Sequence, residues 1–187
     1  MRIETRRLSL TPMTIDDLDE FVAMHAHPDV SRFLGAYERP QALERLAADE
    51  RQWREYGHGL LAVRAKAGGA WLGRVALRHW PQFGETEVGW ALRREAWGHG
   101  YATEAASACV GWGLCALGLP RLTAMIEPAN RRSAAVARRL GMTPVREDQL
   151  LGVTVVVHAV DRTAWTSRTP AAADGTARTP AGTTDVG

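Results

Sequence analysis

The sequence has few cysteines and no long apolar run. Its two cysteines, Cys109 and Cys115, lie in one expected helix at a spacing that places them on different faces. We interpret both as small buried hydrophobic residues, not as a disulfide or a metal site, and expect a reducing cytoplasm. No stretch approaches the roughly 20 apolar residues of a membrane span. The first residues also lack the apolar run of a signal peptide, so we expect no membrane partner.

An excess of one charge sign is also missing. The formal net charge of +2 is too small to indicate a nucleic-acid partner. Of the 23 basic residues only Lys66 is lysine, which we attribute to coding bias, although arginine makes the better forked contacts with phosphate. The six histidines share no metal-site spacing, so we expect no metal.

The composition changes near residue 166. Residues 166–187 consist mainly of Thr, Ala, Pro, Gly and Asp, with almost no large apolar side chain. Such a segment cannot offset the entropy cost of becoming ordered. We therefore predict one domain over residues 1–165 and a disordered tail over residues 166–187.

Alternating and helical apolar patterns predict a mixed α/β sheet with helices packed on it. Strands are expected over residues 5–13, 58–66, 70–79, 85–92 and 121–126, and one or two strands, including residues 151–160, are expected after the last helix. Helices are expected after Thr14, from Pro40, over residues 102–117, and from Asn130 to Gly141, because capping residues and helical spacing coincide there.

A loop with two glycines, Glu95-Ala96-Trp97-Gly98-His99-Gly100, joins an expected strand to an expected helix. Amide groups in the first turn of a helix lack internal partners and, with the helix dipole, form an anion site. Arg93 and Arg94 lie beside it. The loop lacks the third glycine of a dinucleotide fingerprint and the Lys-Ser or Lys-Thr pair of a nucleotide P-loop. Taken alone, it is equally compatible with an ordinary glycine turn.

A second segment runs from Ile126 to Met142 and places Asn130 before an arginine-rich helix. Together with the opening run Thr5–Pro12, the two segments resemble the GNAT N-acetyltransferase superfamily, in particular the branch that acetylates the N-termini of ribosomal proteins. The resemblance spans about Arg2 to Trp165. It implies an α/β GNAT fold, in which a mixed, mostly antiparallel sheet of six to seven strands is flanked by about four helices. It also implies acetyl-CoA as co-substrate.

The resemblance further implies which residues hold the coenzyme. Backbone groups on the strand before the loop would bind the pantetheine arm; they belong to Trp90, Ala91 and Leu92. Amides of the loop and first helical turn would bind the pyrophosphate; they belong to Trp97, Gly98, His99, Gly100, Tyr101 and Ala102. Asn130 would contact the arm near its reactive end. Many family members have Gln or Arg where this chain has Glu95, and an acid there would repel phosphate unless it points away.

Acetyl transfer to an amine requires a neutral amine, a stabilised oxyanion and, in some cases, a proton for the departing thiolate. Glu87 is the candidate base, directly or through water. A solvated strand acid is the alternative, and Glu85 could share its face. Ser133 stands near the position of the family's usual tyrosine donor, where it would donate a hydrogen bond to sulfur or only support the helix start.

We therefore expect direct acetyl transfer from acetyl-CoA to a primary amine, with a protein or peptide N-terminus as the first candidate. A small amine, such as an aminoglycoside or an amino acid, is the second. A coenzyme-binding sensor without turnover is the third. A homodimer stays open because closed symmetric dimers are common. Candidate residues of the acceptor cleft are Tyr37, His79 and Trp80.

Overall fold

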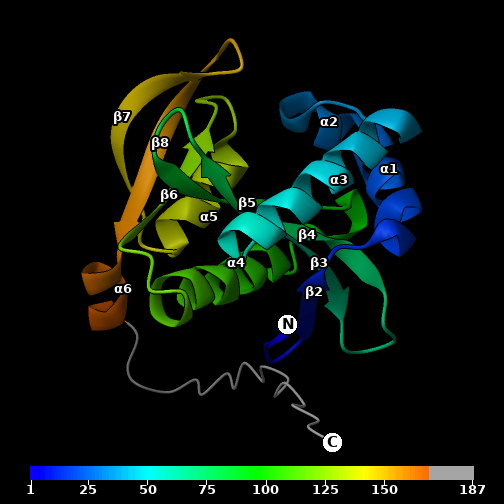
Figure 1. Ribbon diagram of the computed structural model, residues 1–187, viewed down its shortest axis with the longest axis horizontal. Coiled ribbons are helices and arrows are strands. Elements are labelled where there is room, and N and C mark those ends of the chain that lie inside the picture. The colour runs from blue at the N-terminus through cyan, green and yellow to red at the C-terminus, as the bar shows by residue number, and fades with distance from the viewer. Residues whose placement is uncertain (169–187) are drawn as a thin grey trace, which may run out of the picture.

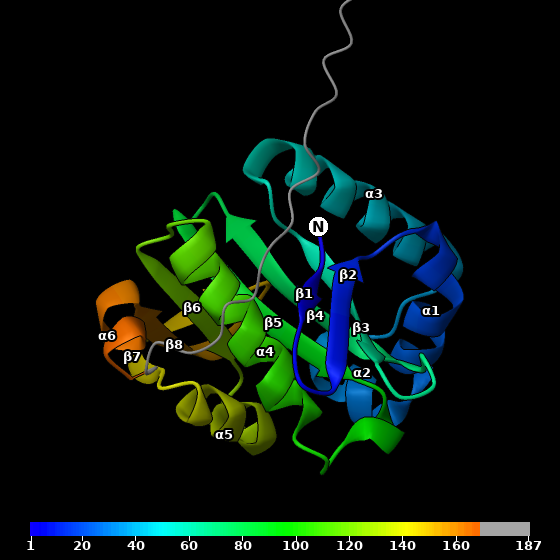
Figure 2. The same ribbon diagram turned by 90° about the horizontal axis from the view of Figure 1, so that it is seen from below.

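The computed structural model describes residues 1–168 of the chain. These residues form one eight-stranded sheet with helices on both faces (Figures 1 and 2). The strands lie in the order β1-β2-β3-β4-β5-β6-β8-β7, and all neighbours are antiparallel except β5 and β6. The predicted mixed, mostly antiparallel α/β sheet is confirmed, but it contains eight strands where six to seven were expected.

The strands are β1 (Ile3–Glu4), β2 (Leu8–Pro12), β3 (Leu60–Ala65), β4 (Trp71–Trp80), β5 (Glu85–Leu92), β6 (Arg121–Ile126), β7 (Thr143–Leu150) and β8 (Val153–Asp161). The α-helices are α1 (Leu18–Ala26), α2 (Pro28–Leu34), α3 (Arg39–Tyr56), α4 (Tyr101–Gly111), α5 (Arg131–Arg139) and α6 (Arg162–Arg168). Short helical turns occupy Ile15–Asp17, Arg94–Ala96 and Trp112–Ala116.

Side-chain alternation on β4 and β5 creates two cores, one on each face of the sheet. Val75, Leu77 and Val88 are buried against the face that α4 and α5 cover. Ala76 and Ala91 point to the opposite face, where they join the core formed with α1, α2 and α3. The same alternation decides which β4 and β5 side chains can reach a cleft on the second face.

Local chemistry explains where the long helices begin and end. At the start of α3 the Gln41 side chain accepts a hydrogen bond from the Glu38 amide, and Pro40 occupies the first turn. Gly57, with φ of 71°, ends this helix in the left-handed conformation. The helix expected over residues 102–117 is α4 followed by a wider π-helical turn over Trp112–Ala116.

Three elements were not expected from the sequence, namely β1, α2 and α6, and β7 is the second of the one or two strands expected after the last long helix. Strand β7 is mostly exposed at the sheet edge, so its sequence carries no apolar alternation. Leu151, expected in the last strand, instead lies in the β7–β8 turn with φ of 51°. Helix α6 includes residues 166–168, which we expected in the tail, and residues 169–187 lie outside the described residues.

Strands β5 and β6 separate where the site lies. They run parallel and are paired only at Glu87 and Thr123. Beyond that pair, the rest of β5 keeps its ladder to β4 and β6 keeps its ladder to β8. The backbone edges that face one another between β5 and β6 are therefore open.

Candidate active site

A cleft of about 330 Å³ lies where β5 and β6 separate. Its walls come from β4, β5, β6, the α2–α3 region, the start of α5 and the β7–β8 hairpin. Four residues that the sequence singled out line it together: Glu87, Trp90, Asn130 and Ser133. Tyr37 and Trp80, two of the candidate residues of the acceptor cleft, also line it. His79 does not, because it stands on the other side of β4 with its ring 4.5 Å from the Tyr56 ring.

The register of β5 decides which backbone groups face the opening between the strands. The Arg93 amide donates to the Leu72 carbonyl at 2.9 Å, and hydrogen-bonded pairs alternate along an antiparallel ladder. Ala91 is therefore bonded to its β4 partner, whereas the backbone groups of Trp90 and Leu92 point toward β6. Of the three strand residues that the resemblance nominated for the pantetheine arm, Trp90 and Leu92 have suitably directed groups and Ala91 does not.

The loop before α4 presents a series of free amides. Gly98 and Gly100 have φ of 82° and 78°, values that favour glycine. Within residues 1–168, the amides of Gly98, His99, Gly100, Tyr101 and Ala102 have no hydrogen-bond acceptor. The Trp97 amide is already bonded to the Arg94 carbonyl at 3.2 Å, so it cannot serve an anion as expected. The remaining donors fit a pyrophosphate at the helix start.

The opening segment of the chain supports this loop. Arg7 pairs with Glu104 in the first turn of α4 at 2.7 Å, and its Nη1 donates to the His99 carbonyl at 3.0 Å. Thr5 Oγ1 donates to the same carboxylate at 2.6 Å. Burial would raise the pKa of Glu104, but the hydrogen bonds from Thr5 and Arg7 outweigh it and lower the pKa. The sequence resemblance included Thr5–Arg7 but did not indicate this role.

The arginines beside the loop are mostly engaged elsewhere. Arg93 pairs with Glu20 at 2.5 Å, and Arg94 pairs with Asp29 at 3.0 Å, so both neutralise acids of the first helices. The exposed Glu95 lines a separate hollow with Arg93 and Arg94, outside the main cleft. Arg132, at the start of α5, lies 4.8 Å above the Trp97 ring and adds a positive charge near the loop.

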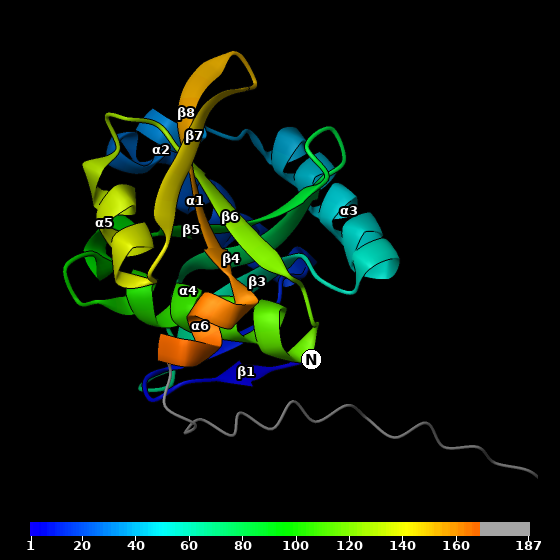
Figure 3. The same cartoon turned by 90° about the vertical axis from the view of Figure 1, so that its left-hand side faces the viewer.

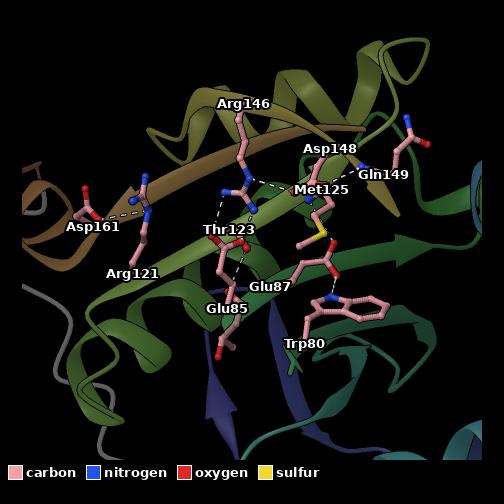
Figure 4. A network of polar contacts seen from close by, with 11 residues as sticks. Trp80, Glu85, Glu87, Arg121, Thr123, Met125, Arg146, Asp148, Gln149 and Asp161 are labelled. Carbon is pink, nitrogen blue, oxygen red and sulfur yellow. Dashed lines mark hydrogen bonds and ion pairs between the residues drawn. The ribbon is translucent and has the colours of Figure 1, made fainter. Parts of the chain in front are cut away.

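Glu87 lies between the two separating strands (Figure 4). Its Oε2 accepts from the Trp80 indole at 2.7 Å, and its Oε1 accepts from the Met125 amide of β6 at 3.3 Å. Burial raises the pKa of this carboxyl, against the lowering effect of those two hydrogen bonds and of Arg78 and Arg74. Glu87 is therefore not the solvated strand acid that formed the alternative interpretation.

Glu85 lies outside the cleft. Both of its carboxylate oxygens accept from the Arg146 guanidinium of β7, each at 2.9 Å (Figure 4). Arg146 also pairs with Asp148 at 3.1 Å, so Glu85 belongs to a surface ion-pair cluster. Of the two acids left open as a base, only Glu87 lines the cleft.

Asn130 and Ser133 form the start of α5. The Asn130 side-chain oxygen accepts from the Ser133 amide at 3.1 Å, which is the capping contact expected from the sequence. The cap uses the oxygen of Asn130 and leaves its amide nitrogen available as a donor. The half-buried Ser133 hydroxyl lines the cleft from the same turn.

Three arginines in the cleft were missed by the sequence analysis: Arg45 of α3, and Arg74 and Arg78 of β4. Burial lowers the pKa of both Arg74 and Arg78 to about 10, and repulsion from Arg45 contributes. For Arg74 and Arg78, the sequence contained a usable signal: the alternation Arg74-Val75-Ala76-Leu77-Arg78 puts these two arginines on the same face of the strand. It was overlooked because such arginines usually lie on a solvated face.

Neither cysteine belongs to the site. Cys109 is a fully buried residue of α4, and burial raises the pKa of its thiol. Cys115 is exposed, so the expectation that both are buried was wrong for this residue. Within residues 1–168, no group of three or more His, Cys, Asp or Glu side chains is placed to hold a metal ion. No helix in that part of the chain is long and apolar enough to cross a membrane.

Comparison with known proteins agrees with this geometry. Residues 7–143 match the model of the acetyltransferase (GNAT) domain. The Bacillus subtilis (strain 168) protein YkkB is 31% identical over 147 residues, which cover 75% of this chain and 84% of that protein. An acetyltransferase structure from Agrobacterium tumefaciens str. C58 has a TM-score of 0.76 at 33% identity, covering 86% of this chain and 94% of the other.

A more distant structure contains the coenzyme. It is RimL, described as a ribosomal L7/L12 alpha-N-protein acetyltransferase in complex with coenzyme A. Its TM-score is 0.70 at 15% identity, with 88% of this chain and 99% of that chain covered. At this identity the likeness concerns the fold alone.

An open pair of parallel strands thus lies beside a helix start with free amides, and the match over residues 7–143 identifies the class of protein as an acetyltransferase. The chain belongs to the GNAT acetyltransferase family. It is an N-acetyltransferase of the fold that binds acetyl-CoA, and it acts on an amine acceptor.

Proposed function

We propose that this enzyme transfers the acetyl group of acetyl-CoA directly to a primary amine, with Glu87 as the proton acceptor. The observation that carries the proposal is the position of the Glu87 carboxylate, which lies in the cleft at the pair where β5 and β6 separate. A protein or peptide N-terminus is the first acceptor class. Its support is the resemblance to the ribosomal-protein branch and the activity of RimL, whose fold this chain shares.

The coenzyme is held by backbone groups in this proposal. The free amides from Gly98 to Ala102 bind the pyrophosphate, and the outward groups of Trp90 and Leu92 bind the pantetheine arm. Arg132 beside Trp97 offsets phosphate charge. Acetyl-CoA supplies an activated thioester, so no acyl-enzyme is needed, which agrees with the placement of both cysteines outside the cleft.

The side chains of the cleft handle the proton. Arg74 and Arg78 disfavour a positive charge nearby and so help to keep the entering amine neutral. Glu87 takes the amine proton, directly or through water, since each carboxylate oxygen keeps a second lone pair after its hydrogen bond. The raised pKa of Glu87 brings the base closer to neutral pH. Ser133 donates a hydrogen bond to the departing sulfur.

The positive charge of the cleft helps to choose between the alternative acceptor classes. An aminoglycoside carries several positive charges, whereas Arg45, Arg74 and Arg78 make the floor of the cleft positive. The sequence contains acids in this region that would suit a polycation, but Glu38, Asp49, Glu50 and Glu55 do not line the cleft. We therefore set the aminoglycoside aside and keep the amino acid as the second acceptor.

A thiol-release assay with acetyl-CoA tests the proposal. The acceptor panel contains N-terminal peptides, free amino acids and one aminoglycoside. We expect thiol release with at least one peptide or amino acid, and none above background with the aminoglycoside. Binding of coenzyme A without thiol release from any acceptor would replace the enzyme proposal with the sensor interpretation.

A further inference from the structure

Three guanidinium groups converge on the floor of the cleft. Arg74 and Arg78 stand on the same face of β4, four residues apart, and Arg45 reaches the cleft from α3. Within residues 1–168, none of the three takes part in an ion pair with an acid. Other arginines near the site, such as Arg93 and Arg94, do have carboxylate partners.

Of the three arginines, Arg74 has a buried nitrogen whose hydrogen-bonding capacity is unsatisfied. Its Nε is buried and has no hydrogen-bond partner within residues 1–168. A buried, unpaired cation is costly, and the cost falls when an anion binds. A charge held without a partner beside the reacting groups indicates a ligand-binding role.

Neither acid in the lining forms an ion pair with Arg74, although Glu87 interacts with it electrostatically. Glu87 is the cross-strand neighbour of Arg78 in the β4–β5 ladder, and its carboxylate accepts hydrogen bonds from the Trp80 indole and the Met125 amide. Glu127 lies at the end of β6 near Asn130. Ala91 is the cross-strand partner of Arg74, so no acid faces it from β5. The cleft thus offers a proton acceptor and, beside it, a guanidinium group that has no ion-pair partner within residues 1–168.

The mouth of the cleft is apolar. Phe33 and Leu34 of α2 line one side, and Leu151, which is 83% exposed, lies with Val153 at the tip of the β7–β8 hairpin. Figures 1 and 3 show α2 and this hairpin tip at the same end of the molecule. An acceptor with an apolar portion would cover these side chains while its charged groups lie deeper.

We propose that Arg74, assisted by Arg78 and Arg45, binds a carboxylate of the amine acceptor. The forked guanidinium matches a carboxylate, and the pair forms charge-assisted hydrogen bonds. The acceptor is thus a primary amine with a nearby carboxylate and an apolar portion. The carboxylate belongs either to a free apolar amino acid or to an acidic side chain at a peptide N-terminus. This inference rests on the proposed function, because it names the acceptor of the same site.

Matched acceptor pairs test the inference and distinguish the two sources. Leucine is compared with leucinamide, and a peptide that begins with Asp is compared with the same peptide beginning with Asn. We expect kcat/KM to be roughly tenfold or more higher for the acid of one pair, the usual size of a charge-assisted hydrogen bond. The pair that shows the preference identifies the source. Equal kcat/KM within both pairs overturns the inference but leaves the proposed acetyl transfer in place.

Arg74→Met removes the charge while it keeps an apolar stem in the same space. The acid-over-amide ratio should collapse toward one, because kcat/KM for the acid should fall by roughly tenfold or more beyond any change in kcat/KM for the neutral acceptor. Arg121→Gln is the matched control, because Arg121 pairs with Asp161 on the surface and lies outside the cleft. A ratio that survives in Arg74→Met, with its thermal unfolding cooperative, contradicts the assignment.

A binding measurement does not depend on turnover. N-acetyl-leucine and an N-acetylated Asp peptide carry the carboxylate of the two expected products, and N-acetyl-leucinamide and the Asn peptide lack it. We expect one of the acids, and neither neutral analogue, to raise the Tm of the wild-type enzyme and not that of Arg74→Met. If neither acid binds better than its neutral analogue, the inference fails. Absence of thiol release alone counts against the proposed function.

Discussion

At the scale of single residues, the proposed base Glu87 also makes a structural contact. Its carboxylate joins Trp80 of β4 to the backbone of β6 at the pair where the parallel ladder ends. The sequence indicated an acid in this strand but could not choose between Glu87 and Glu85. The choice depends on Arg146, which lies 61 positions beyond Glu85 in the chain and occupies both of its oxygens.

Glu87→Gln tests the role of base. We expect kcat to fall by about 100-fold, within the usual range for loss of a general base. Because burial raises the pKa of Glu87, the wild-type rate should fall with decreasing pH as this carboxyl becomes protonated, and the variant should lose that acid limb.

Glu85→Gln is the matched control, since it changes a neighbouring acid that lies outside the cleft. Its kcat should stay within about threefold of wild type, because a surface ion pair contributes little. An acid limb that persists unchanged in Glu87→Gln would assign the base to another group.

His25 is a buried residue whose titration should affect the stability of the fold. It is fully buried, its Nδ1 lies 3.0 Å from the Gly35 carbonyl, and its ring packs against Phe21 and Tyr37. Burial, and then the charge of Arg74, lower the pKa of His25 to about 4 from its ordinary 6.5. The folded protein therefore binds this proton less readily than the unfolded chain does.

The depressed pKa makes stability depend on pH. Between pH 6.5 and pH 4 the unfolded chain binds more protons at this site, so the free energy of unfolding should decrease as pH falls. The expected loss from pH 7 to pH 5 is about 2 kcal/mol. Urea unfolding at both pH values measures it, and His25→Gln should lose that part of the difference. Equal pH dependence in wild type and variant would show that His25 does not titrate as described.

At the scale of elements, the start of α4 carries the coenzyme assignment. Gly98 has φ of 82° and open space where a Cβ would stand, so a larger residue there meets backbone strain and no clash. The loop is held from behind by Arg7 and Glu104, which connect it to the opening segment of the chain. A change in backbone angle at Gly98 should therefore redirect the free amides.

Gly98→Val should weaken coenzyme A binding by roughly tenfold or more, since a left-handed β-branched residue costs about 1–3 kcal/mol. Isothermal titration with coenzyme A measures the Kd. Gly68→Val provides the control, because Gly68 has φ of 76°, equally open space and a place in the distant β3–β4 turn. If both variants bind coenzyme A as tightly as wild type, the loop is not the pyrophosphate site.

The elements differ in how well the sequence predicts them. Strands β3, β4 and β5 and helix α5 carry clear apolar periodicity and capping residues, so their positions were expected. Helix α2 is only seven residues long, and β7 is a charged edge strand, so neither has a periodic apolar face. The cause is physical, because an element with little buried surface leaves little pattern in the sequence.

At the scale of the whole molecule, the cleft is formed by segments that are far apart in the chain. Its lining extends from Phe33 of α2 to Val155 of β8. The sequence placed Glu87, Trp90, Asn130 and Ser133 in one site through the family resemblance. It did not place Arg45, Arg74 and Arg78 there, because only the packing of α3 across β4 turns the exposed side of that strand into the floor of a cleft.

The central claim is that this molecule moves an acetyl group from acetyl-CoA to an amine. The most direct measurement follows thiol release and the mass of the acceptor in one reaction with an active acceptor from the panel. The account predicts one acetylated amine for each thiol released, with both products dependent on enzyme and acceptor. Coenzyme A binding without either product, across all peptides and amino acids, would contradict it.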